Sequence, residues 1–284
     1  MVSEAKNPAI VISASRMTDL PAWYPLRLIE EIEIRRNKGQ KIHTLVLWTK
    51  HPQSLLRKSL ADYLEKLKRE AVQLYIQLTI SGMGGRVVGT DKDGKAWMPE
   101  PKAPDTQESL SLLPEIVQLT GSPDRIRLRI DPLLKIKDSL GKFYSNVSEI
   151  EYIVRESARQ GIHYFSFSLV RPGIYRKVDR RFEKEGIHLL DFTQEDQDAL
   201  RRKFTLLQSE LGIRLEACSV EGWPTSACID GQLLMQLHPE GGLISLKKPH
   251  SRPLCGCTHS IDIGGWPPKP CPTGCIYCYA RPQR

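Results

Sequence analysis

Three cysteines near the end of the chain have a spacing that suits iron–sulfur chemistry. Cys271, Cys275 and Cys278 lie in the run Cys-Pro-Thr-Gly-Cys-Ile-Tyr-Cys. Three thiolates on one short loop can hold three irons of a cubane 4Fe–4S cluster, because cysteine thiolate is the usual ligand of such clusters. The fourth iron then receives no ligand from this loop, and an open coordination position distinguishes a catalytic metal site from a structural one. The spacing therefore predicts a catalytic 4Fe–4S cluster.

The chain has four further cysteines, Cys218, Cys228, Cys255 and Cys257, so all seven lie in its last quarter. In a reducing compartment, cysteines clustered in this way favour metal binding over disulfides. Four thiolates are enough to ligate a second iron–sulfur cluster or a zinc ion. The alternative is that one or two of them are buried apolar thiols, as free cysteines often are.

Short apolar runs alternate with amphipathic stretches along most of the chain. The expected strands are residues 10–13, 44–48, 74–80, 126–130, 164–169 and 213–217, and the clearest helices are 56–67, 150–157 and 200–211. Such alternation is typical of parallel strands with helical crossovers. We therefore expect an α/β fold, a partial (β/α) barrel of about six parallel strands, with a doubly wound sheet as the alternative.

Two domains are expected. Residues 1–238 would form the (β/α) barrel domain, and residues 239–284 a cysteine-rich iron–sulfur segment packed on the barrel mouth. The second segment is rich in proline and lacks apolar periodicity, so a bound metal would have to supply its order.

Residues 82–104 form an insertion rich in glycine, proline and charge, which is either a lid or a loop with no role. Within it, Asp93-Gly94 predicts a hairpin turn between residues 86–88 and 96–98.

Polar residues follow several of the expected strands, where a parallel sheet carries its chemistry. Arg129 and Asp131 alternate with apolar residues in the fourth strand, so both face the same side of the sheet. They are the candidate catalytic residues. Thr49 and Lys50 follow the second strand. They are candidate cofactor-binding residues.

Composition and charge indicate a soluble protein. The chain is 40% hydrophobic and 26% charged, and its apolar runs are too short to cross a membrane. Residues 1–8 carry Glu4 and Lys6 and lack the apolar stretch of an export signal. We expect a cytoplasmic protein with no membrane partner. The net charge of +8 indicates either an ordinary solvated surface or a polyanionic partner such as nucleic acid.

The Cys271–Cys275–Cys278 spacing, with aromatic Tyr277 before the last cysteine, resembles the CxxxCxΦC signature of radical S-adenosylmethionine enzymes. The resemblance implies a 4Fe–4S cluster whose open iron binds S-adenosyl-L-methionine. It also implies a one-electron reduction that cleaves the sulfonium of the cofactor and gives a 5′-deoxyadenosyl radical. It also implies a reductant such as flavodoxin or ferredoxin and a small-molecule or nucleic-acid substrate. Gly274 would let the backbone approach the cluster without a Cβ, and Tyr277 would pack over the cluster or the adenine.

The whole chain is similar to an uncharacterised prokaryotic family, a domain of unknown function with a radical-enzyme-like cysteine cluster at its C-terminus. The matching runs are residues 12–19, 47–50, 129–132, 255–257, 262–264 and 271–280. In most radical S-adenosylmethionine enzymes the cysteine loop follows the first barrel strand. Here Cys278 lies six residues before the end, which implies a permuted arrangement with the tail folded back over the strand ends. The alternatives are a zinc-stabilised structural tail on a barrel of other function and an electron-transfer iron–sulfur module.

Overall fold

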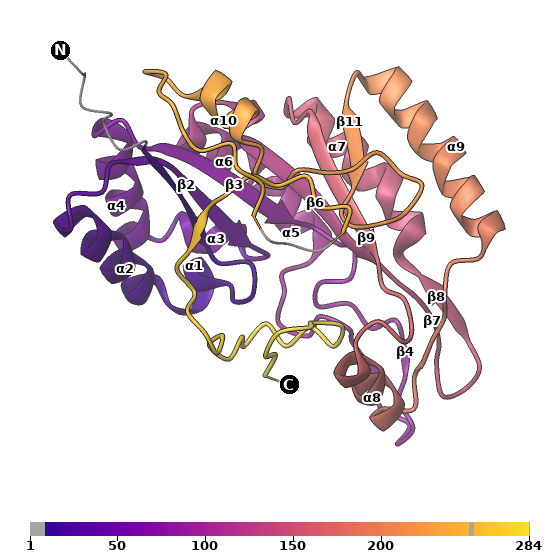
Figure 1. Cartoon of the computed structure of the whole chain (residues 1–284). Helices are drawn as coiled ribbons and strands as arrows, with labels where there is room; N and C mark the ends of the chain where they lie inside the picture. The colour runs from indigo at the N-terminus through magenta and orange to yellow at the C-terminus, as the bar shows by residue number, and fades with distance from the viewer. Residues whose placement is uncertain (1–8, 250–252, 284) are drawn as a thin grey trace, which may run out of the picture.

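A seven-stranded parallel sheet forms the centre of the fold (Figure 1). The computed structural model of the chain describes residues 9–249 and 253–283, so residues 1–8, on which the expectation of no export signal rests, lie outside the described part. The spatial order of the strands is β11-β9-β6-β3-β2-β1-β12. Their bounds are β1 Ile10–Ala14, β2 Ile42–Thr49, β3 Gln73–Thr79, β6 Ile126–Leu133, β9 Tyr164–Leu169, β11 Arg214–Ala217 and β12 Ile261–Asp262.

The six strands expected from the apolar runs are confirmed, and a seventh joins them from the cysteine-rich segment. This strand, β12, pairs in parallel with β1, with Ile12 opposite Ile261 and Ser13 opposite Asp262. In the part of the chain that the structure describes, β11 and β12 are the two free edges and no closed barrel forms. The α/β fold with parallel strands is therefore confirmed as an open sheet of seven strands.

The predicted helices are also present, and their ends follow local sequence signals. The three expected helices are α4 (Lys58–Arg69), α7 (Ile150–Arg159) and α9 (Gln194–Leu211). Thr193 and Asp196 form a capping box that begins α9, and Gly212 ends it at a φ of +64°. The remaining helices are α1 Leu20–Trp23, α2 Pro25–Asn37, α3 Pro52–Leu55, α5 Thr106–Ser111, α6 Leu113–Thr120, α8 Arg176–Lys184 and α10 Gly231–Leu237. None of the helices in the described ranges has the length and apolar character that a membrane span requires.

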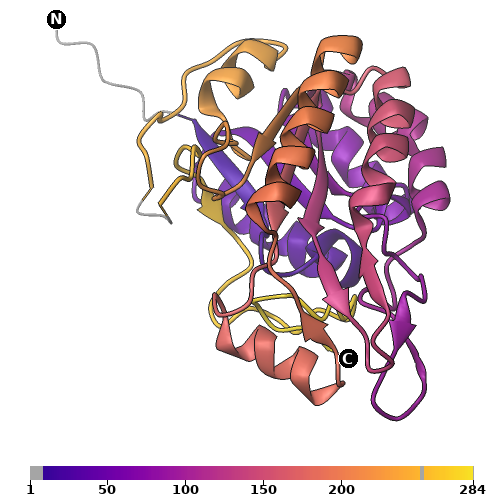
Figure 2. The same ribbon diagram turned by 90° about the vertical axis from the view of Figure 1, so that its right-hand side faces the viewer.

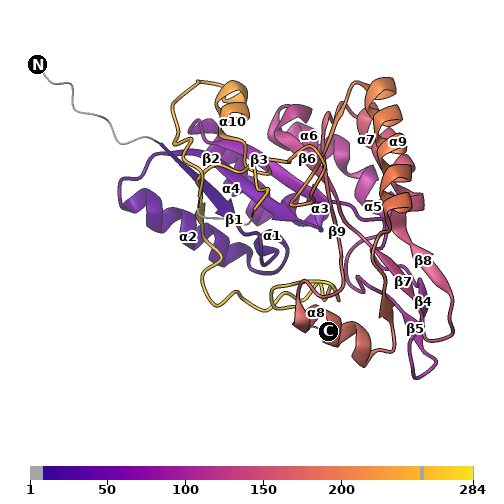
Figure 3. The same cartoon turned by 45° about the vertical axis from the view of Figure 1, so that its right-hand side comes forward.

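The two faces of the sheet are covered differently. Leu45 and Leu47 point into the main core, which also contains buried residues of α2, α4, α6, α7 and α9. Val46 lies between them on the opposite face, because side chains alternate along a strand. There it packs in a smaller cluster with α10, Cys228 and Cys257. The crossover helices thus lie on one face, and α10 with its neighbouring loops lies on the other (Figure 3).

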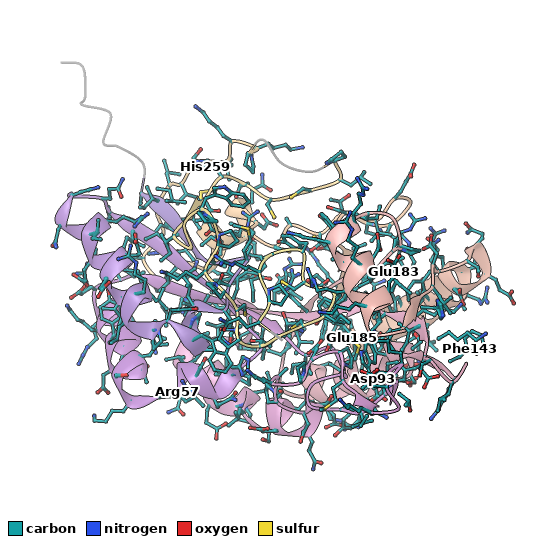
Figure 4. All side chains as sticks on the ribbon, turned by 90° about the horizontal axis from the view of Figure 1, so that it is seen from below. Arg57, Asp93, Phe143, Glu183, Glu185 and His259 are labelled. Carbon is teal, nitrogen blue, oxygen red and sulfur yellow. The ribbon has the colours of Figure 1, made fainter. Side chains whose placement is uncertain are left out.

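Two small sheets extend below the main one. The strands β4 (Gly89–Thr90) and β5 (Ala96–Trp97) form the predicted hairpin, with the first arm slightly further along the chain than expected. The hairpin packs against the end of α8, where Lys92 N–H donates to the Glu185 carbonyl at 2.9 Å. The labelled Asp93 and Glu185 mark this region in the view from below (Figure 4). The other small sheet consists of β7 (Lys135–Lys137), β8 (Phe143–Ser145) and β10 (His188–Leu189).

Candidate functional site

The segment after β12 runs beneath the carboxyl ends of β1 and β2 and carries the loop of residues 271–278, here called the cysteine loop (Figures 1 and 2). Side chains that follow these two strands hold it there. The Tyr24 hydroxyl donates to the Pro270 carbonyl at 2.7 Å, and the Trp23 indole N–H donates to the Thr273 hydroxyl at 2.9 Å. His51 Nε2 lies 2.9 Å from the same hydroxyl. The loop is therefore anchored at the strand ends.

Helix α8 and the insertion before α5 hold the opposite side of the cysteine loop. The Arg181 guanidinium donates to the carbonyls of Ile276 and Cys278, the latter at 2.6 Å. The Ile276 N–H donates to the Pro99 carbonyl at 3.0 Å, and the rings of Tyr175 and Tyr279 stack with centroids 5.5 Å apart. The backbone of the loop is thus fixed from several elements that are far apart in the sequence.

Gly274 is required by the backbone of the cysteine loop itself. Its φ is +73°, and a Cβ at this position would lie 2.7 Å from the Gln283 carbonyl oxygen. The Gln283 N–H in turn donates to the Cys271 carbonyl at 2.9 Å. The sequence predicts that Gly274 lets the backbone approach a cluster. The structure shows a different requirement for glycine, namely a left-handed turn that packs against the Gln283 carbonyl.

The thiols of the cysteine loop lie among charged groups. Burial raises the pKa of Cys275, the nearby Glu100 carboxylate raises it further, and the Lys50 ammonium opposes the rise. Burial also raises the pKa of Cys278, while the Ala280 N–H and the cations of α8 favour its thiolate. The Ala280 N–H lies 3.4 Å from the Cys278 sulfur. Each of these sulfurs therefore has at least one group nearby that would stabilise a negative charge.

A buried carboxylate that the sequence analysis missed connects the insertion to the cysteine loop. Glu100 is 1% exposed and accepts hydrogen bonds from Ser81 Oγ at 2.6 Å, Lys50 Nζ at 3.1 Å and the Tyr277 hydroxyl. Lys50 Nζ also lies 5.7 Å from the centre of the Tyr277 ring. Two predicted cofactor-binding residues thus meet at Glu100. Only its place in the insertion of residues 82–104, interpreted as either a lid or a loop with no role, could have drawn attention to it.

Thr49, also predicted to bind a cofactor, belongs to a buried network beside the loop. Its hydroxyl donates to Asp19 Oδ2 at 2.9 Å, and the Lys50 N–H donates to the same oxygen at 2.8 Å. Asp19 also caps α1 through the Ala22 N–H. Burial raises the pKa of Asp19 to about 6, and these three hydrogen bonds oppose the rise. These hydrogen bonds hold the backbone at the end of β2 and so position Lys50.

The two predicted catalytic residues lie on the same face of β6, as expected from their alternation. The Arg129 guanidinium forms an ion pair with Asp131, and its centre lies 5.1 Å from the Trp48 ring. Asp131 accepts a hydrogen bond from the Ser168 hydroxyl, and its carbonyl lies 3.4 Å from Lys50 Nζ. Arg129 Nη1 donates to the Cys228 sulfur at 2.9 Å. Arg129 therefore contacts the second group of cysteines.

The second group consists of Cys218, Cys228, Cys255 and Cys257, and the fold brings its members together. The thiols of Cys218 and Cys257 both hydrogen-bond to Cys228 and, together with the charge of Arg129, lower its pKa. The contact with Cys228 and burial raise the pKa of Cys257, and the charge of Cys255 raises it further. Within residues 9–249 and 253–283, no three histidine, cysteine, aspartate or glutamate side chains are arranged so that they could hold a single metal ion.

Gly264 sets the path from β12 to the cysteine loop. A Cβ here would lie 2.2 Å from Ser15 Oγ and 2.6 Å from Ser15 Cβ. We expect Gly264→Ala to lower the free energy of unfolding by about 1–3 kcal/mol, because a methyl group does not fit in this contact. Urea denaturation measures the change. Adding Ser15→Gly should recover part of the lost stability. An unchanged unfolding midpoint in Gly264→Ala would show that the methyl group is accommodated beside Ser15 without loss of stability.

Comparison with known proteins identifies one family. The sequence model of a family described as "Domain of unknown function (DUF1848)" matches residues 11–280. No curated protein and no solved structure gives a significant match to the chain.

Proposed function

The chain belongs to the DUF1848 family, and from this premise we propose that it is an iron–sulfur enzyme of the radical S-adenosylmethionine type. Cys271, Cys275 and Cys278 would hold a 4Fe–4S cluster with one iron open to the cofactor. When bound, the reduced cluster would supply one electron that cleaves a C–S bond of S-adenosyl-L-methionine, which gives methionine and a 5′-deoxyadenosyl radical for hydrogen abstraction. The clustered cysteines suit a reducing compartment such as the cytoplasm.

The observation that carries the proposal is the position of the cysteine loop in the sheet. The loop follows β12, which lies beside β1 at one edge of the sheet. Ligands of open parallel sheets bind at the carboxyl ends of the strands. Because the crossover helices lie on one face, we interpret the sheet as a partial barrel that is open between β11 and β12. In this interpretation β12 is the first strand of the barrel in space, although it is the last in the sequence. A cysteine loop that follows β12 would therefore correspond to the loop that follows the first barrel strand in most radical S-adenosylmethionine enzymes.

The charged groups around the cysteine loop also support the proposal. A buried thiolate is costly unless cations or hydrogen-bond donors compensate its charge. Burial raises the pKa of both Cys275 and Cys278, and nearby cations oppose the rise: Lys50 at Cys275, and Arg181 and Lys177 at Cys278. The Ala280 N–H points at the Cys278 sulfur. Tyr277 and Lys50, which meet at Glu100, would line the position of the cofactor.

Electron paramagnetic resonance tests this proposal. The protein is reconstituted anaerobically with iron and sulfide, reduced with dithionite, and measured with and without S-adenosyl-L-methionine. We expect the signal of a reduced 4Fe–4S cluster that changes when the cofactor is added. A cluster signal that does not respond would favour an electron-transfer module. Zinc without acid-labile sulfide would favour a structural tail.

The substrate and the electron donor would approach from different sides. Asp131, Ser168 and Trp48 line the face of the sheet opposite the crossover helices, and we assign this face to a small-molecule substrate, with nucleic acid as the alternative. Helix α8 exposes Arg176, Lys177 and Arg180 beside the cysteine loop. We assign this helix to an acidic reductant such as flavodoxin or ferredoxin, because complementary charge accelerates protein association.

The double variant Arg176→Glu/Arg180→Glu is expected to slow reduction of the cluster by flavodoxin or ferredoxin roughly tenfold at low salt, because electrostatic steering is lost. Reduction by dithionite should stay unchanged. Stopped-flow spectroscopy measures both rates. The matched control is Lys38→Glu/Arg202→Glu, which changes the net charge equally on other elements. If both double variants slow the reaction to the same extent, then net charge decides the rate and α8 is not the docking site.

A further inference from the structure

We propose that His43 and His238 form a pH-sensitive latch, which holds α10 and the residues after it on the sheet at neutral pH and releases them in mild acid. Helix α10 lies at the end of the sheet away from the cysteine loop (Figures 1 and 3). Neither histidine belongs to the site described above. The proposal therefore stands or falls separately from the proposed function.

The two imidazole rings are in direct contact. Their centroids lie 4.1 Å apart, with the ring planes inclined by 36°. His43 lies at the start of β2 and is 2% exposed, and His238 directly follows α10. Gly242 passes so close to His43 that a Cβ on it would lie 3.2 Å from the Cδ2 atom of the ring. The chain that leaves α10 therefore packs directly on His43.

A chain of hydrogen bonds joins His43 to α10. The Gln73 side-chain amide donates to the Leu234 carbonyl of α10 at 3.0 Å and to the Thr44 hydroxyl oxygen at 3.0 Å. The same Thr44 oxygen lies 2.7 Å from His43 Nδ1. Since this oxygen accepts from Gln73, we assign its own hydrogen to the bond with Nδ1, which makes Nδ1 an acceptor and places the hydrogen of the neutral ring on Nε2. Protonation of Nδ1 would break this chain of hydrogen bonds.

His238 has the same arrangement. Its Nδ1 accepts a hydrogen bond from the Glu240 N–H at 3.2 Å, so its ring hydrogen is also on Nε2. Nε2 of both rings is buried and has no hydrogen-bond partner among the described residues. A proton on either ring would therefore break an existing hydrogen bond, and a proton on both rings would place two positive charges in contact.

The surroundings of His43 disfavour its protonation. Burial, together with the charges of His238 and Lys41, lowers the pKa of His43 to about 4. The Gly242 carbonyl opposes this decrease without forming a hydrogen bond to Nε2. Because the pKa of a released histidine is near 6.5, the closed latch keeps its full stability above about pH 6.5 and loses it as the pH falls toward about 4.

Groups from several segments face His238. Burial lowers its pKa, and the Arg125 guanidinium, directly before β6, lowers it further. The carbonyls of His43 and Ala71 and the Glu240 carboxylate oppose this decrease. Both rings thus bind protons more weakly in the closed latch than after release, and the same fall in pH acts on both.

Hydrogen exchange of the full-length protein at about pH 7.5 and about pH 5, followed by mass spectrometry, tests the latch. Protection factors are compared, because intrinsic exchange itself slows in acid. With a pKa near 6.5 when released and about 4 when closed, protonation of His43 alone should lower the protection of α10 and residues 238–244 about thirtyfold at the lower pH. Helix α9, which packs in the main core, should keep its protection. Unchanged protection of α10, or an equal loss in α9, would overturn the proposal.

The double variant His43→Gln/His238→Gln removes both rings and should show the same protection of α10 at the two pH values. The matched control is His188→Gln/His259→Gln, which replaces two exposed histidines and should retain the loss of about thirtyfold. A loss of the same size in His43→Gln/His238→Gln would show that other groups sense the pH, and the latch would be rejected.

A measurement on the wild-type protein covers the case in which the double variant is already open at neutral pH. We expect the imidazole NMR signal of His43 to keep the chemical shift of a neutral ring from about pH 7.5 to about pH 6. A titration of this signal with a midpoint near 6.5 would show that the contacts described here do not hold the ring neutral, and would overturn the proposal.

Discussion

Cys275→Ser is expected to abolish the cluster signal that responds to S-adenosyl-L-methionine, together with any turnover that depends on it. Cys275 is 7% exposed and lies closer to the interior than the other two cysteines of its loop. Serine has nearly the same size, so the fold should survive. Its hydroxyl, however, stays protonated at neutral pH and is a far weaker iron ligand than a thiolate. Electron paramagnetic resonance and iron analysis of the reconstituted variant measure the loss.

Cys255→Ser is the matched control for this substitution. It makes the same chemical change in the second group of cysteines, which packs in a different apolar cluster from Ile276 and Tyr277 of the cysteine loop. We expect it to keep the signal that responds to the cofactor. If Cys275→Ser retained the full iron content and spectrum of the wild-type protein, the cysteine loop would not be the cluster site, and the radical chemistry proposed here would have to be abandoned.

Glu100→Gln is expected to raise the reduction potential of the cluster at the cysteine loop by about 60 mV or more, equivalent to about tenfold in a one-electron equilibrium. Glu100 is buried and raises the pKa of Cys275 through its negative charge, after burial itself. The same charge opposes the addition of an electron to a cluster at this place. Removing it while keeping the side-chain shape should therefore make reduction easier.

Lys50→Met tests the same electrostatic argument with the opposite sign. Burial and Glu100 raise the pKa of Cys275 and the Lys50 ammonium opposes this rise, so removing the ammonium should lower the reduction potential. Redox titration followed by electron paramagnetic resonance gives both values. Glu108→Gln, an exposed substitution on α5, is the control and should leave the potential unchanged. Shifts of the same sign in Glu100→Gln and Lys50→Met would mean that the packing around Tyr277, and not charge, controls the site.

Much of the fold could be predicted because its signals are local. All six expected strands are present, since each is a short apolar run whose periodicity is contained in the run itself. The capping box of Thr193 and Asp196 and the left-handed Gly212 define α9 within a few residues of its ends. The two-residue strand β12 was not predicted, because a segment so short has no periodicity to detect.

The candidate site could be predicted only in part. The alternation of Arg129 and Asp131 correctly placed both on one face, but it could not show that Arg129 contacts Cys228, which is 99 residues away. Glu100 was missed because a charged residue in a polar insertion looks like a solvated one. Its burial depends on Lys50 and Tyr277, which lie 50 and 177 residues from it in the sequence.

Apolar periodicity, capping residues and thiol spacing act over a few residues, so the strands, the main helices and the two groups of cysteines can be recognised in the sequence. Where the two groups of cysteines lie in the molecule depends on its tertiary structure. It placed Asp262 within hydrogen-bonding distance of Ser13, 249 residues away, and so brought the cysteine loop to the carboxyl ends of β1 and β2. Such contacts depend on how distant segments pack together, and no short stretch of sequence encodes them.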